Sequence, residues 1–309
     1  MKRFPNISRR QFLRALAALS TSSLLWPISG IARPNSFITK TIPSSNESIP
    51  AIGLGSSRTF NVGNDPVARD ACTEVMRNFF KTGGRLIDSS PMYGSSQDVI
   101  GYGLKKLNST EVFSADKVWI ASSRNGPRQI EASRQRWNVK LFDLMQVHNL
   151  LSWEDHLPML HKMKKAGKIR YVGITTSHGR RHSDFEQIMR NHKLDFIQLS
   201  YNILDREVET RLLPLAKEKG IAVIVNRPFQ RGELINRVKR YPLPDWASEI
   251  DCRNWAQFLL KFIVSHPAVT CAIPATSRVD HVLENMGAGT GRLPDTNLRK
   301  RMIAYVEGL

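Results

Sequence analysis

The chain has 309 residues, of which 41% are hydrophobic, and a formal net charge of +18. This apolar content is enough for a large folded domain and excludes a disordered chain. The charge favours anionic cofactors, substrates or membrane surfaces, but no zinc-finger spacing and no basic run interleaved with aromatic residues indicates nucleic-acid binding. Three distant cysteines, Cys72, Cys252 and Cys271, outline neither a disulfide scaffold nor a metal site, and we expect them to be small buried residues.

The N-terminus combines basic residues with an apolar stretch. Paired arginines stand in Ser8-Arg-Arg-Gln-Phe-Leu13, and Arg14 and several hydroxyl residues interrupt the apolar run. The run is shorter than the roughly 20 apolar residues of a membrane span, and the pattern resembles a twin-arginine export signal. We therefore expect residues 1–32 to be a signal peptide, residues 33–48 to be a linker or hairpin, and the mature protein to lie in the periplasm without stable membrane insertion. The alternative is an amphipathic N-terminal helix of a cytoplasmic protein.

From about Ile49 onward, short apolar runs alternate with helical patterns. This alternation predicts strand-helix units around a parallel sheet. Eight units in roughly 260 residues match a single (β/α)₈ barrel better than an open doubly wound sheet, so we expect residues 49–309 to form one such barrel. The expected strands are Ala51–Leu54, Arg85–Asp88, Lys117–Ser122, Phe142–Val147, Arg170–Thr175, Phe196–Leu199, Ile221–Val225 and Val269–Ile273.

A candidate active site lies in the segment Leu86-Ile-Asp-Ser-Ser-Pro-Met-Tyr-Gly94. An apolar strand ends there in a carboxylate, Asp88, and a turn of small residues presents Tyr93. In a (β/α)₈ barrel, catalytic groups gather where strands end and loops begin, so the two side chains can face one pocket. The alternative is an aspartate that caps the turn and a tyrosine that packs on the surface.

Several motifs follow in order along the chain. They are Asp143-Leu-Met-Gln-Val-His148-Asn149, Gly167-Lys-Ile-Arg-Tyr-Val-Gly173-Ile, Ile197-Gln198-Leu-Ser-Tyr-Asn, and Glu284-Asn285 after Ile273-Pro274. Together with the Asp88–Tyr93 segment, these motifs resemble those of the aldo-keto reductases, and the resemblance extends from Ile49 to about Met286. The export signal resembles the twin-arginine signals that a bacterial branch of that family carries. The resemblance implies an NADP(H)-dependent oxidoreductase that passes hydride from the nicotinamide to the carbonyl carbon of a small aldehyde or ketone.

The resemblance also implies catalytic roles. Tyr93 would protonate the carbonyl oxygen, and His148 would orient that oxygen by hydrogen bonding. The family pairs the aspartate with a lysine that lowers the tyrosine pKa. With the third strand at Lys117–Ser122, Ser123 takes the place of this lysine, and we expect Arg124 to supply the missing charge or the reaction to be slow. Because neighbouring strand residues point to opposite faces, Arg124 would enter the site only if the strand bulges.

The resemblance implies cofactor contacts at the ends of the later strands. Gln198 and Thr175 would contact the nicotinamide carboxamide, Arg227 the pyrophosphate, and Arg278 the 2′-phosphate at a helix N-terminus, where barrels often hold phosphate. The full set of expected cofactor-binding residues is Gln198, Thr175, Arg227, Ser277, Arg278, His281, Glu284 and Asn285. Asn226 stands where the family usually stacks an aromatic ring on the nicotinamide.

Two other functions stay open at this stage. A nucleotide-binding barrel without the lysine could sense redox state or bind a partner without catalysis. Alternatively, Asp88, Tyr93 and His148 could carry out non-redox acid-base chemistry on a sugar or a similar small molecule. Substitution of Arg278 separates these possibilities, because it weakens cofactor binding in the first case and has no effect in the second.

Overall fold

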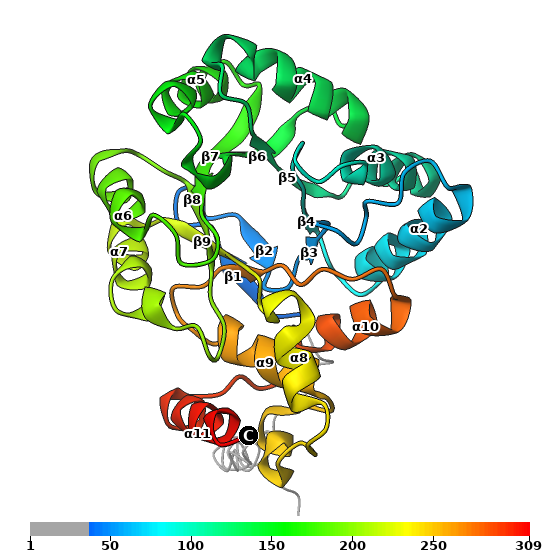
Figure 1. Ribbon diagram of the computed structural model, residues 1–309, viewed down its shortest axis with the longest axis vertical. Coiled ribbons are helices and arrows are strands. Elements are labelled where there is room, and N and C mark those ends of the chain that lie inside the picture. The colour runs from blue at the N-terminus through cyan, green and yellow to red at the C-terminus, as the bar shows by residue number, and fades with distance from the viewer. Residues whose placement is uncertain (1–36) are drawn as a thin grey trace, which may run out of the picture. The chain divides into compact units, whose positions relative to one another are not determined.

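The computed structural model describes residues 37–309 (Figure 1), and the predicted signal peptide lies outside the described residues. A hairpin of β1 (Thr39–Thr41) and β2 (Ser48–Pro50) precedes eight parallel strands. These strands are β3 (Leu54–Gly55), β4 (Leu86–Asp88), β5 (Phe113–Val118), β6 (Phe142–Val147), β7 (Ile169–Thr175), β8 (Phe196–Ser200), β9 (Ala222–Asn226) and β10 (Cys271–Ala272). Parallel bridges between Ile52 and Ala272 and between Gly55 and Ala275 join the first and last strands. The expected (β/α)₈ barrel is therefore confirmed.

Helices surround this sheet in Figure 1. They are α2 (Pro66–Lys81), α3 (Ser96–Leu107), α4 (Gly126–Trp137), α5 (Trp153–Lys165), α6 (His182–Asn191), α7 (Leu212–Lys219), α8 (Glu233–Val238), α9 (Trp255–Val264), α10 (Val279–Gly287) and α11 (Thr296–Glu307). Left-handed C-cap residues end several of them, such as Gly220 after α7, which turns the chain back into β9. Within residues 37–309, no helix has the length and apolar character needed to cross a membrane.

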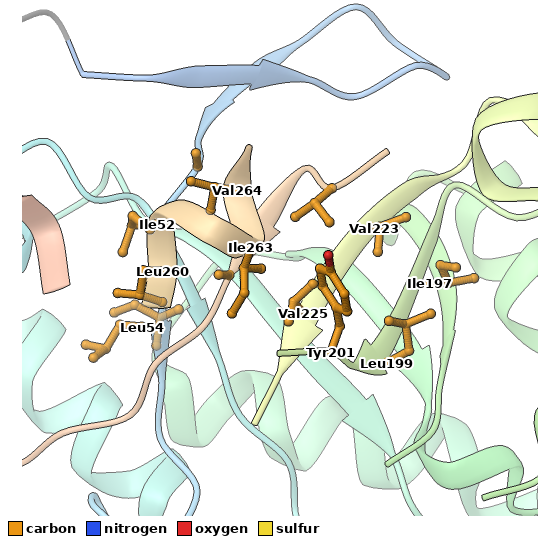
Figure 2. Close-up of a cluster of buried hydrophobic side chains, with 14 of the residues drawn as sticks. Ile52, Leu54, Ile197, Leu199, Tyr201, Val223, Val225, Leu260, Ile263 and Val264 are labelled. Carbon is orange, nitrogen blue, oxygen red and sulfur yellow. The ribbon is translucent and has the colours of Figure 1, made fainter. Parts of the chain in front are cut away.

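The strands separate two apolar cores because successive side chains point to opposite faces. Inside the barrel, Leu86, Phe113 and Phe196 pack with Ile42 and Ile49 of the hairpin segment. Between the sheet and the helices lies the larger core, and Figure 2 shows part of it. The side chains labelled there are Ile52, Leu54, Ile197, Leu199, Tyr201, Val223, Val225, Leu260, Ile263 and Val264. The hairpin therefore closes the amino end of the barrel and leaves the carboxyl ends of the strands for a site.

The third expected strand is displaced in a way that changes the site. The third barrel strand was predicted at Lys117–Ser122, but β5 covers Phe113–Val118. Its register is fixed by Phe113 and Ala115, which are buried in the interior core. Trp119, which the sequence places inside the strand, is 40% exposed. The strand therefore ends at Val118, close to the residue at which the sequence predicted that it would begin.

The cysteines match the expectation. Cys72, Cys252 and Cys271 are buried and free. Burial raises the pKa of the Cys72 thiol to about 11 and that of Cys252 to about 12. A thiolate is the reactive form of cysteine, so these side chains act as apolar packing groups at neutral pH.

Candidate active site

A buried ion pair lies at the carboxyl ends of β4 and β5. The two strands are hydrogen-bonded in parallel, with Asp88 opposite Ala115. Because side chains alternate along a strand, Lys117 points to the interior like Ala115, two residues before it. Its Nζ atom lies 2.5 Å from Oδ2 of Asp88, and the two side chains are 0% and 3% exposed. The barrel therefore holds a fully enclosed lysine-aspartate pair.

This pair corrects the sequence-based expectation. Lys117, not Ser123, occupies the position next to Asp88, because β5 begins four residues earlier than predicted. Ser123 and Arg124 follow the strand in a 3₁₀ turn, η1 (Ser123–Asn125). Arg124 is exposed and does not line the central cavity. The prediction of an incomplete catalytic set is wrong, and the expectation of a slow reaction loses its basis.

Tyr93 lies next to this pair. Its ring centroid is 5.3 Å from the Nζ atom of Lys117. Burial raises the pKa of the Tyr93 phenol above its ordinary value, and the positive charge of Lys117 opposes that rise. For Lys117, burial is the largest single effect and acts to lower the pKa, but the combined effects of the neighbouring Asp88, Tyr93 and Asp116 outweigh it, so its pKa is raised. The lysine is thus a permanent cation beside a neutral phenol.

His148 follows β6 and completes the cluster. Its ring and the Tyr93 ring are perpendicular, with centroids 5.7 Å apart. Burial, together with the charge of Lys117, lowers the pKa of His148 to about 3. Its Nδ1 atom lies 2.8 Å from Oγ of Ser90. The imidazole is therefore neutral at physiological pH and is held by one hydrogen bond from the β4 loop.

Two amides complete the surroundings of Asp88. Nε2 of Gln198 donates to Oδ1 of Asp88 at 2.8 Å, and Nε2 of Gln146 donates to the same oxygen at 3.4 Å. These residues come from β8 and β6, so four strands of the barrel meet at this carboxylate. Gln198 was expected to contact a cofactor, and in this structure its amide nitrogen contacts Asp88.

A cavity of about 1300 Å³ opens above this cluster. The predicted site residues that line it are Asp88, Tyr93, His148, Thr175, Gln198, Arg227, His281, Glu284 and Asn285. Small-molecule pockets typically measure roughly 300–1,000 Å³, so the space suits a large ligand together with a smaller one. The cavity extends from Tyr93 to α10, so the expected catalytic residues and the expected cofactor-binding residues of α10 lie along one continuous space.

The predicted cofactor residues at the end of the barrel separate into two groups. His281, Glu284 and Asn285 face the cavity from α10. Ser277 and Arg278 do not line it. Arg278 is 64% exposed, and its guanidinium is ion-paired with Asp280 at 2.5 Å. The structure therefore brings the helix residues to the cavity and leaves Arg278 turned toward its own helix.

The wall beneath the β8 and β9 strand ends is polar. Asn226, which stands where the family has an aromatic ring, accepts from Ser200 at 2.7 Å and donates to the Thr176 carbonyl at 3.0 Å. Arg227 follows it in a left-handed conformation, with φ of 52°. Its buried Nη1 atom has no hydrogen-bond partner among the described residues. Burial, together with the charge of Arg231, lowers the pKa of Arg227.

The fold and the site define a class: a (β/α)₈ barrel with a tyrosine, a lysine, an aspartate and a histidine at the carboxyl ends of its strands. A family model described as the aldo/keto reductase family matches residues 51–302. The chain belongs to this family.

Named relatives agree with this membership. The chain is 28% identical over 247 residues to an NADH-specific methylglyoxal reductase of Escherichia coli, a match that covers 67% of this chain and 73% of the relative. It is 24% identical to an L-galactose dehydrogenase of Arabidopsis thaliana, covering 84% and 90%. The structure is similar to an aldo-keto reductase of Klebsiella pneumoniae in complex with NADPH, with a TM-score of 0.73, 22% identity and coverage of 88% and 95%. The two relatives are named for different activities, so membership of the family alone does not identify the substrate.

Proposed function

We propose that the protein is an NADP(H)-dependent carbonyl reductase that acts on a small aldehyde or ketone. The observation that supports this most strongly is the buried Lys117–Asp88 pair beside Tyr93 and His148. Removing charges from water is costly, and a buried pair adds little net stability. Strongly perturbed titratable groups in a cavity are characteristic of catalytic sites.

The cavity residues fit the proposed cofactor. The unpartnered Nη1 of Arg227 offers a donor to a phosphate oxygen, and Arg231 lines the same cavity. Gln198 would hold the carboxamide end, while Glu284 and Asn285 would lie toward the adenine end. When bound, NADP(H) supplies the hydride. The choice between NADPH and NADH depends on the 2′-phosphate, for which Arg278 stays our candidate.

The protein side chains control the proton. Tyr93 would donate its phenolic proton to the carbonyl oxygen as negative charge develops there. The Lys117 ammonium would stabilise the phenolate that remains, and Asp88 holds the ammonium in place at 2.5 Å. His148, neutral at physiological pH, would hydrogen-bond the same carbonyl oxygen and set its orientation. General acid catalysis of this kind contributes roughly 10²–10⁴ to the rate.

A titration tests the proposal directly. The mature chain from Arg33 is titrated with NADPH and NADH by fluorescence, and 4-nitrobenzaldehyde is then added in a stopped-flow instrument. We expect NADPH to bind and its absorbance to fall on addition of the aldehyde. Tyr93→Phe, which removes only the hydroxyl, should bind equally well and turn over far more slowly. Binding without oxidation would indicate the non-catalytic sensor, and absence of binding would contradict both nucleotide functions.

We also propose that the protein is exported to the periplasm as a folded barrel, because the N-terminal pattern resembles a twin-arginine signal. That route carries folded proteins and could bring a bound cofactor along. Cell fractionation tests this proposal: Arg9→Lys together with Arg10→Lys should leave the protein in the cytoplasm. An unchanged distribution of the variant would contradict export by this route.

A further inference from the structure

The loop after β4 contains two buried serines whose hydroxyls differ in their contacts. Ser89 and Ser90 are both 0% exposed. The Ser89 hydroxyl has no hydrogen-bond partner among the described residues. The Ser90 hydroxyl lies 2.8 Å from Nδ1 of His148 and also accepts from the backbone N–H of Met92 at 3.2 Å. Of the two serines, therefore, only Ser90 is hydrogen-bonded to the histidine.

Hydrogen-bond counting assigns the direction of the Ser90–His148 bond. A serine hydroxyl has one proton to donate and can accept two bonds. The Met92 N–H already uses one acceptor position of Ser90. If Nδ1 of His148 carried the proton, the Ser90 hydroxyl would be buried with its own proton unpaired, which is costly. The arrangement that satisfies both groups has Ser90 donating to an unprotonated Nδ1.

The protonation state of His148 completes the argument. Its low pKa keeps the ring neutral, and a neutral imidazole carries one proton. With Nδ1 as the acceptor, the proton lies on Nε2. His148 lines the cavity, and Nε2 is the ring nitrogen that Ser90 leaves available.

We propose that Ser90 is a positioning residue that holds His148 in the tautomer with Nε2 protonated, so that His148 presents an N–H donor to the carbonyl oxygen of the substrate. The proposal rests on the proposed function for its catalytic consequence. The tautomer itself is independent of turnover. Without Ser90, the neutral ring would carry its proton on either nitrogen. In the form with the proton on Nδ1, the lone pair of Nε2 would face the carbonyl oxygen and repel it.

Nitrogen NMR of the full mature protein, labelled with ¹⁵N-histidine, tests the tautomer. The chain has eight histidines, and the signals of His148 are assigned by their loss in His148→Gln. At neutral pH we expect one protonated nitrogen, Nε2, and one unprotonated nitrogen, Nδ1. Ser90→Ala should move both His148 signals toward an average of the two tautomers, Ser90→Thr should restore them, and Ser89→Ala should leave them unchanged. Unchanged signals of the other histidines show that each variant is folded.

Kinetics supply the second measurement. Ser90→Ala should lower kcat by roughly five- to tenfold, the effect of one lost hydrogen bond, with a smaller change in KM for NADPH. Ser90→Thr should recover most of the loss. A wild-type spectrum with the proton on Nδ1, or a Ser90→Ala spectrum identical to wild type, would overturn the proposal. If the Nε2-protonated form is found but no carbonyl compound is reduced, the tautomer assignment stands and the proposed function fails.

Discussion

The buried pair can be tested by removing its cation. Lys117→Met replaces the ammonium by an apolar side chain of similar length and leaves Asp88, 3% exposed, without its ion partner. Removing one member of a buried pair typically costs about 3–5 kcal/mol. Asp88 keeps the amide donor of Gln198 at 2.8 Å, so we expect a loss of about 3 kcal/mol in the free energy of unfolding.

Lys117→Met should also lower turnover. Without the ammonium, the phenolate of Tyr93 has no adjacent cation, and we expect turnover to fall by roughly 10²–10⁴, the range of general acid catalysis. Urea unfolding and single-turnover oxidation of NADPH by an aldehyde measure the two effects separately. Arg124→Gln is the control. Its side chain is exposed and does not line the cavity, so the free energy of unfolding should change by less than about 0.5 kcal/mol and turnover should stay the same.

A double variant separates charge burial from catalysis. Asp88→Asn together with Lys117→Met removes both charges, and replacement of both partners of a buried pair is often close to neutral. Asparagine also retains an oxygen that can accept from Gln198. We expect most of the lost stability to return, while turnover stays low. The reasoning is refuted if Lys117→Met keeps both stability and turnover, or if Arg124→Gln is the variant that loses activity.

Three further predictions concern single side chains. His148 has a pKa of about 3 against an ordinary 6.5, so the unfolded chain takes up a proton first, and the free energy of unfolding falls as the pH drops below about 6.5. His148→Gln should remove roughly 2 kcal/mol of that loss between pH 7 and pH 5. Parallel curves of the free energy of unfolding against pH for the two proteins would contradict this prediction. Burial raises the pKa of Asp116 to about 7 from 3.8, so the free energy of unfolding falls as the pH rises from about 4 to 7. Urea titrations should show that Asp116→Asn gains roughly 3–4 kcal/mol in the free energy of unfolding relative to the unsubstituted protein over that interval. A difference between the two proteins that does not depend on pH would argue against the raised pKa. Asp280→Asn should release Arg278 from its ion pair and tighten NADPH binding several-fold relative to NADH in a fluorescence titration; equal effects on the two nucleotides would exclude Arg278 from the 2′-phosphate site.

The sequence predicts most of the fold because the strand ends carry clear signals. The expected strand Phe142–Val147 agrees with β6 at both ends, and Asp88 ends β4 as expected. Both strands read as apolar runs followed by a polar functional residue. Alternation with helical patterns then leaves few topologies besides the barrel. The barrel and three of the four residues of the candidate site, Asp88, Tyr93 and His148, could therefore be predicted from the sequence.

Lys117 could not be predicted in the same way. Asp116 and Lys117 form a charged pair in the sequence and resemble the start of a strand, whereas both are buried inside one. The signal that could have identified the register is Phe113-Ser-Ala-Asp-Lys117, in which alternate residues face the barrel interior. The Ser90–His148 bond is also beyond local patterns, because its partners are 58 residues apart and meet only through the order of β4, β5 and β6.

The interior of the barrel changes character along its axis. At the hairpin end, the inward positions of β4 and β5 are Leu86 and Phe113, and both are apolar. At the cavity end, the inward positions are Asp88 and Lys117. An apolar pair would fill the second layer without the cost of desolvating two charges, so packing alone does not account for them. Lys117 lies beside Tyr93, and an enclosed cation is worth more to a developing phenolate, the role that we propose for Tyr93, in a medium of low dielectric than in water. The layer that packing alone does not explain is thus the one that lies against Tyr93.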